Sequence, residues 1–145
     1  MPEFFILQNT PSTPEWNNIF TTVLDHCDQF EVFYPDGEFD EENPLMGGKL
    51  DFEKLESTFS NTWDGMDNSV CIRGNLTSES KNIIFKFMEP SFSGDKPELW
   101  HINLLKSGTL YLSVEDFTVC VLENHPEIIS LFQQIGISTE IFDNF

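Results

Sequence analysis

Hydrophobic and polar residues alternate in several short runs of this chain, as they do in strands that bury one face. The N-terminal half has two such runs, EFFILQ at 3–8 and FEVFY at 30–34. The C-terminal half has four, rich in β-branched and aromatic residues, at 81–88, 98–105, 109–114 and 117–122. The residues KSGT at 106–109 predict a tight turn. We therefore expect four consecutive strands, a β-meander, in the C-terminal half.

Apolar residues recur at helical spacing in the N-terminal half. Thr13 is the expected N-cap of a first helix, Pro14 its first residue, and its apolar face consists of Trp16, Ile19, Phe20, Val23, Leu24 and Cys27. Asp51 is the expected cap of a shorter helix with one apolar stripe, Phe52, Leu55 and Phe59.

A last helix is expected at 124–136. Asn124 is its N-cap, Glu127 stands at the capping-box position, and Gly136 ends it. In the meander, one face of the middle two strands is apolar and needs a cover: Trp100, Ile102, Leu104, Leu110, Leu112 and Val114. The first and last helices can supply that cover, so the fold class is α+β, an antiparallel sheet with helices packed on it.

The chain has 145 residues and is 39% hydrophobic, with 15 phenylalanines, which predicts one globular domain over 1–145. The N-terminus lacks the basic region and the apolar length of a signal peptide. No apolar stretch approaches the roughly 18 residues of a membrane span. The three cysteines, Cys27, Cys71 and Cys120, are widely spaced and predict buried thiols in a reducing compartment. We expect a soluble, cytoplasmic protein that contacts no membrane.

The net charge of −18 is concentrated at the two ends of the chain. Residues 1–48 contain ten acids and no Lys or Arg, and residues 107–145 contain six acids and no Lys or Arg. The middle of the chain holds all seven basic residues against nine acids. Such a surface repels nucleic acid and attracts basic proteins at long range.

The densest acidic run is YPDGEFDEE at 34–42, with five carboxylates: Asp36, Glu38, Asp40, Glu41 and Glu42. Alternate acids suggest a calcium loop, but Glu41 replaces the glycine that an EF-hand needs at position six, and Gly47 replaces the glutamate at position twelve. We therefore expect no metal site here. The run is either a solvated loop or a surface for a basic partner.

Catalytic motifs are absent from the sequence. The histidines His26, His101 and His125 are isolated, no serine lies in a GxSxG motif, and LMGGKL at 45–50 lacks the spacing of a phosphate-binding loop. His101 is expected on the polar face of its strand, as a surface or interface residue. We expect no catalytic residue, cofactor or small-molecule substrate.

A second stretch that could bind a partner is NTWDGMDN at 61–68. Trp63 either packs into the core or, if it is exposed, forms an aromatic anchor beside the carboxylates of Asp64 and Asp67. An aromatic side chain ringed by acids is typical of a hot spot for a basic protein.

Small size, acidity, the absence of catalytic motifs and the two loops that combine aromatic and acidic residues give the chain a recognisable profile. In this profile the whole chain resembles the immunity proteins of bacterial toxin–immunity pairs, including those of contact-dependent growth inhibition. The resemblance implies one-to-one binding to a cognate toxin domain in the cytoplasm. Nuclease toxins are basic because they bind phosphates, so an acidic antidote gains association rate and complementarity.

On this reading, Asp36–Glu42, together with Asp64 and Asp67, meets Lys and Arg side chains of the toxin and keeps its RNA or DNA substrate out. Two other readings remain open. The carboxylates could copy a phosphate array and occupy the nucleic-acid site of another protein, or the chain could be an enzyme with an unrecognised carboxylate site.

Overall fold

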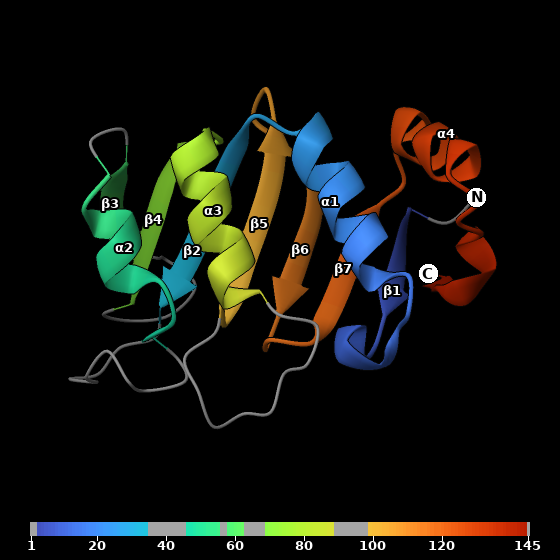
Figure 1. Cartoon of the computed structure of the whole chain (residues 1–145), viewed down its shortest axis with the longest axis horizontal. Helices are drawn as coiled ribbons and strands as arrows, with labels where there is room; N and C mark the ends of the chain where they lie inside the picture. Colours follow the sequence, from blue (N-terminus) through green and yellow to red (C-terminus); the bar gives the residue numbers. More distant parts are fainter. Residues whose placement is uncertain (1–2, 35–45, 56–57, 63–68, 89–98, 145) are drawn as a thin grey trace.

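The computed structural model describes residues 3–34, 46–55, 58–62, 69–88 and 99–144 (Figure 1). Within them, eight strands form one sheet in the order β3-β4-β2-β5-β6-β7-β1-β8, and all neighbouring strands are antiparallel. The strands are β1 (Phe4–Leu7), β2 (Gln29–Tyr34), β3 (Phe59–Thr62), β4 (Val70–Asn75), β5 (His101–Lys106), β6 (Thr109–Glu115), β7 (Val119–Glu123) and β8 (Asp143–Asn144).

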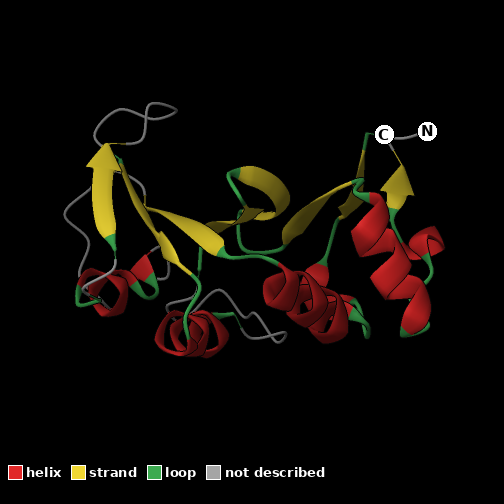
Figure 2. Cartoon of the chain, turned by 90° about the horizontal axis from the view of Figure 1, so that it is seen from above, coloured by secondary structure: helices red, strands yellow, loops and turns green. Residues whose placement is uncertain are grey.

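The α-helices are α1 (Trp16–His26), α2 (Lys49–Glu53), α3 (Ser78–Phe87) and α4 (Pro126–Gln134), with short 3₁₀ turns at Thr10–Ser12 and Thr139–Ile141. Figure 2 shows these α-helices of the described residues on the same side of the sheet. This arrangement confirms the predicted α+β class, with the first and last helices on an antiparallel sheet. In the described part of the chain, no helix has the length and apolar character that crossing a membrane requires.

The core lies between the helices and one face of the sheet. The predicted apolar face of α1 is buried, as are the residues of the central strands that the helices cover: Ile102, Leu104, Leu112 and Val114. Burial of these aliphatic and aromatic side chains is the main force that holds the helices on the sheet. The predicted apolar face of α1 is thus confirmed. Of the four predicted strands of the meander, the last three are confirmed as β5, β6 and β7.

The expected strand at 81–88 is wrong, because these residues belong to α3. Thr77 caps this helix: its hydroxyl accepts from the backbone N–H of Ser80, and the Ser80 hydroxyl accepts from the Thr77 N–H. Ser80 and Ile84, one turn apart, face the core. A short apolar run fits a buried helix as well as a strand, and here the cap favours the helix. Strand β2 pairs with β5 on one side, and the strand on its other side is β4, which precedes α3 in the chain.

Leu110 does not share a face with Leu112, contrary to the expectation. The β5–β6 register shifts by one residue after Leu104, which pairs with Leu112, whereas Leu105 pairs with Leu110. Paired residues of an antiparallel sheet point to the same face, so this β-bulge moves Leu110 to the face of Leu105. The predicted turn is confirmed, since Ser107 and Gly108 have φ of 51° and 81°.

The helix ends differ from the expected caps in three places. Helix α1 begins after Glu15, and the Thr13 hydroxyl instead donates to the backbone oxygen of Asn9. Helix α2 begins after Gly48, not at Asp51, and Phe59 lies in β3.

The last helix also starts later than expected. Its N-cap is His125, not Asn124, and Glu127 forms no capping box because its carboxylate accepts from the Tyr111 hydroxyl. Gly136, with φ of 82°, follows the last turn as predicted.

Candidate functional site

The side of the sheet opposite the helices carries a patterned polar surface on β4, β2 and β5. Val32, Ile72 and Ile102 pair across these strands and are fully buried under the helices. Their neighbours in sequence therefore point to the other side. There they form three cross-strand rows: Asn75, Gln29 and Leu105, then Arg73, Glu31 and Asn103, then Cys71, Phe33 and His101. We call this surface the outer face.

An ion pair occupies the middle row of the outer face. The Nε atom of Arg73 lies 2.8 Å from Oε2 of Glu31, and the side-chain amide of Asn103 donates to Oε1 of Glu31 at 3.1 Å. The Glu31 side chain is only 17% exposed, whereas that of Arg73 is 50% exposed. Both oxygens of the carboxylate are therefore held in a defined position by neighbouring strands.

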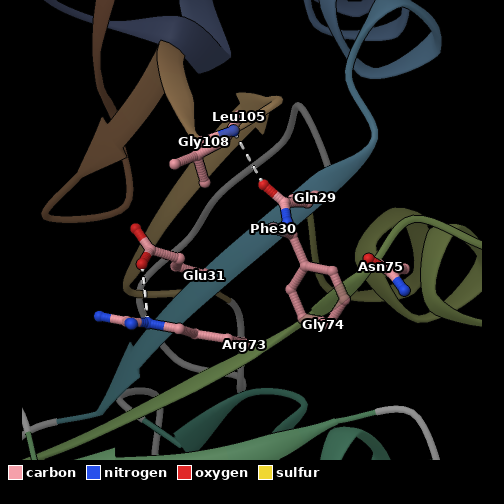
Figure 3. Close-up of a pocket in the computed structure, with 8 residues that line it drawn as sticks. All are labelled: Gln29, Phe30, Glu31, Arg73, Gly74, Asn75, Leu105 and Gly108. Carbon is pink, nitrogen blue, oxygen red and sulfur yellow. Dashed lines mark hydrogen bonds and ion pairs between the residues drawn. The ribbon is translucent and has the colours of Figure 1, made fainter.

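A cavity of about 350 Å³ lies beside this ion pair (Figure 3). Its lining residues are Gln29, Phe30, Glu31, Arg73, Gly74, Asn75, Leu105 and Gly108. The backbone N–H of Gly108 donates to Oε1 of Gln29 at 3.1 Å, which fixes the side chain of Gln29 against the β5–β6 turn. The cavity thus combines the ion pair of Glu31 and Arg73, two carboxamides and the apolar residues Phe30 and Leu105.

His101 and Phe33 form the row nearest the start of β5. Their rings meet edge to face, with 4.8 Å between centroids. Burial lowers the pKa of His101, and the carboxylate of Glu115 opposes that shift. His101 is half-buried on the outer face, where the sequence placed it. Phe33 is buried yet lies outside the main core cluster.

A second group of titratable side chains joins α1 and α4 on the helix side. The Tyr111 hydroxyl donates to Oε1 of Glu127, and Nε2 of His26 lies 3.9 Å from the same oxygen. The ring of His125 stacks on Tyr111 at 3.9 Å, and its Nε2 lies 3.0 Å from the backbone oxygen of Leu110. The hydrogen bond raises the pKa of Tyr111 to about 12 and lowers the pKa of Glu127. This arrangement fastens α4 to the sheet.

The predicted partner-binding residues lie outside the described residues: Asp36, Glu38, Asp40, Glu41, Glu42, Trp63, Asp64 and Asp67. The described residues that flank the two segments are neighbours in the sheet. Tyr34, the last residue of β2, pairs with Val70, and Val70 also pairs with Thr62, the last residue of β3. Both segments therefore start from the same end of the sheet. The binding roles of their residues stay predictions.

The three cysteines are buried, as predicted, and none forms a disulfide. Burial raises the pKa of the Cys27 thiol to about 12 and also raises the pKa values of Cys71 and Cys120. A buried, protonated thiol is a poor nucleophile at neutral pH. Among the residues that the structure describes, no group of three or more His, Cys, Asp or Glu side chains could hold a metal ion.

The sequence did not reveal the Glu31–Arg73–Asn103 group. The alternation of FEVFY places Glu31 on the face opposite Val32, and this was the available signal. The partners of Glu31 come from strands that begin and end far away in the chain. Comparison with known proteins adds no assignment: no family model, curated protein or solved structure matches the chain.

Proposed function

We propose that this protein is an immunity-type protein, which binds a cognate basic toxin domain one to one and neutralises it without catalysing a reaction. The toxin domain of this proposal is a nuclease, whose own surface is basic because it binds phosphates. The complex forms in the cytoplasm and needs no cofactor, nucleic acid or small-molecule substrate. The resemblance in profile to immunity proteins of toxin–immunity pairs motivates this choice.

The observation that carries the proposal is that most of the described Lys and Arg side chains form ion pairs within the protein. Six of the seven Lys and Arg residues are described, since Lys96 lies outside. Four of these six pair with the protein's own carboxylates at 2.8 to 3.7 Å: Lys49, Arg73, Lys81 and Lys86. The basic charges are thus largely matched internally, and a partner meets the acidic excess that gives the net charge of −18. This field favours a basic partner and disfavours nucleic acid.

The outer face supports the same reading. It presents the carboxylate of Glu31, the hydrogen-bonded carboxamides of Asn103 and Gln29 and the half-buried ring of His101 on one face of the sheet. Protein interfaces use such preorganised groups for specificity. Interfaces of this kind bury roughly 1,600 Å² in total. In the proposed mechanism, Asp36–Glu42 with Asp64 and Asp67 speeds the encounter, Trp63 anchors the complex, and the bound protein excludes RNA or DNA from the toxin.

The test is capture of partners from the native cell with the tagged protein, at low and at moderate salt, followed by a nuclease assay. A single basic domain recovered in equal amount, whose nuclease activity falls to zero at one equivalent of this protein, supports the proposal. Two results would contradict it. One is the absence of any stoichiometric protein partner. The other is capture of a nucleic-acid-binding protein that DNA or RNA displaces, because that result would identify a nucleic-acid mimic.

A further inference from the structure

We propose that the cavity beside Glu31 is the subsite that receives one arginine side chain of the basic partner. This inference rests on the proposed function and names the chemical group that the outer face recognises. The arginine guanidinium would lie against the carboxylate of Glu31 and the carboxamide oxygens of Gln29 and Asn75, with its methylene groups along Leu105.

Two acceptors of the cavity, Glu31 and Gln29, are held in place by hydrogen bonds and can each accept further bonds. Each carboxylate oxygen of Glu31 accepts one bond, from Asn103 or from Arg73, and a carboxylate oxygen can accept two. Oε1 of Gln29 likewise accepts one bond, from the N–H of Gly108. These side chains therefore lose little rotational freedom when a donor binds, which reduces the entropic cost of association.

The charge around the cavity selects a cation. Arg73 is the basic residue in the lining, and its Nε atom is directed at Glu31. Figure 3 shows the two side chains lying together, so their charges largely cancel locally. At the β5–β6 turn, the Asp28 carboxylate accepts from the backbone N–H of Ser107, next to the lining residue Gly108. Because the pair is close to neutral, the field at the cavity comes from Asp28 and from the net charge of −18, and this field opposes an anion and attracts a cation.

Arginine fits this set of acceptors better than lysine. Its planar guanidinium presents five N–H donors in a fixed fork, so that several oxygens can be reached at once, whereas an ammonium presents three donors from a single atom. Arginine is also enriched among the residues that dominate binding energies at interfaces. The apolar side chain of Leu105 offers a contact for the arginine methylene groups.

The test uses the full chain, labelled with ¹⁵N, and three probes: the acetylated amides of arginine, lysine and glutamate. We expect the arginine probe to shift the side-chain amide signals of Gln29, Asn75 and Asn103 saturably, in the millimolar range. The lysine probe should bind several-fold more weakly, and the glutamate probe should cause no saturable shift. Preference for glutamate, equal binding of arginine and lysine, or the absence of any saturable shift would overturn the proposal.

Two variants make the test specific. Glu31→Gln should weaken arginine binding by about tenfold, because it removes the charge of a charge-assisted hydrogen bond. Glu53→Gln is the matched control: it also removes one carboxylate from an ion pair, with Lys49 at 3.6 Å, but on α2. It should leave arginine binding unchanged. Equal binding by Glu31→Gln and the wild type would place the arginine elsewhere.

The same variants separate this proposal from the proposed function. If the captured partner binds Glu31→Gln as tightly as the wild type, the subsite proposal fails and the immunity function stands. If the arginine probe binds at Glu31 but no stoichiometric partner is captured, the proposed function fails and the cation subsite stands. A well-dispersed amide spectrum of each variant verifies that the sheet is intact.

Discussion

Glu31 on β2 lies directly opposite Arg73 on β4, and their side chains form an ion pair with 2.8 Å between Oε2 and Nε. Asn103 of β5 donates to the other oxygen of the same carboxylate. One glutamate therefore connects the side chains of three adjacent strands on the outer face. The carboxylate of Glu31 is therefore positioned by polar contacts on the outer face, whereas the hydrophobic core lies on the other side of the sheet.

Exchange of the two charges tests how much this ion pair stabilises the fold. Arg73→Glu alone places two carboxylates opposite each other and should lower the free energy of unfolding by about 1 kcal/mol. The double variant Glu31→Arg with Arg73→Glu should recover about half of that loss, since a half-exposed pair contributes little and Asn103 then loses its acceptor. Urea unfolding followed by circular dichroism measures both values. No recovery in the double variant would contradict a direct interaction.

The hydrogen bond between Tyr111 and Glu127 predicts an unusual response to alkaline pH. The chain has two tyrosines, and the pKa of each is raised, to about 12 for Tyr111 and well above its ordinary value for buried Tyr34. The folded state therefore binds protons that the unfolded state releases near pH 10. Stability from this source is complete below that pH and is lost as pH rises toward 12.

Absorbance of tyrosinate measures this effect. We expect no increase in the folded protein between pH 9.5 and 10.5, where free tyrosine ionises (about pH 10), and a full increase when the chain is unfolded in urea. Tyr111→Phe should lower the free energy of unfolding by about 1 kcal/mol, because α4 loses a hydrogen bond to the sheet. A tyrosine that titrates near its ordinary pKa in the folded wild type would contradict the described contact.

The lowered pKa of His101 leads us to expect a smaller free energy of unfolding at mildly acidic pH. Burial against Phe33 lowers its pKa in the folded state, so the unfolded chain binds a proton more readily. Stability should be unaffected by His101 above its unfolded pKa of about 6.5 and should fall as pH decreases from there toward the lower folded pKa. Urea unfolding at pH 7.5 and 5.5 measures this difference.

His101→Gln is the control for that measurement, because it removes the titrating ring and keeps a polar side chain. The decrease in stability between the two pH values should be smaller in this variant than in the wild type. A His101 ring that titrates at or above the ordinary histidine pKa in an NMR titration would show that the site is not desolvated.

Prediction from sequence succeeded where long-range context was not needed. The face of α1, the β5–β6 turn and the α+β class follow from local periodicity and turn residues. The strand prediction at 81–88 was wrong because the apolar residues of this run fit the helical period as well as the strand period. The N-cap at Thr77 favours the helix. The outer face could not be predicted, because the pairing of Glu31 with Arg73 depends on the register between strands distant in the chain.

Strand β4 was missed for a related reason, which concerns Gly74. Glycine interrupts a strand pattern and is usually unfavourable there, so VCIRGN did not resemble a strand. In the structure, a Cβ atom at this position would lie 2.9 Å from Cγ2 of Thr58 and 3.0 Å from Cε1 of Phe30. The ring of Phe30 needs this space, so glycine is required by packing that the sequence pattern does not reveal.

Gly74→Ala should therefore destabilise the protein although alanine suits a strand no worse than glycine. We expect a loss of about 1–3 kcal/mol in the free energy of unfolding, typical of overpacking. Gly108→Ala is not a suitable control because its φ is 81°. The better control is Gly74→Ala combined with Phe30→Leu, which makes room beside the strand. The combined loss should be smaller than the sum of the two single losses.

Reversal of Asp40, Glu41 and Glu42 to lysine tests whether the acidic run steers the partner. The variant changes the net charge from −18 to −12, since each of three reversals adds two charges. Association with the captured basic domain should slow by about tenfold at low salt and much less at high salt, because steering is screened over about 8 Å at physiological ionic strength. Stopped-flow fluorescence measures the association rate at several salt concentrations.

A matched variant separates local steering from total charge. Glu3, Glu79 and Glu140 are exposed acids of the described residues, and their reversal to lysine gives the same net charge of −12. If the run at Asp36–Glu42 faces the partner during the encounter, this second variant should associate faster than the first. Equal rates would mean that only the overall field matters, and unchanged kinetics in the first variant would rule the run out as the steering surface. Dissociation should change little in either variant, because rim charges act mainly on the association rate.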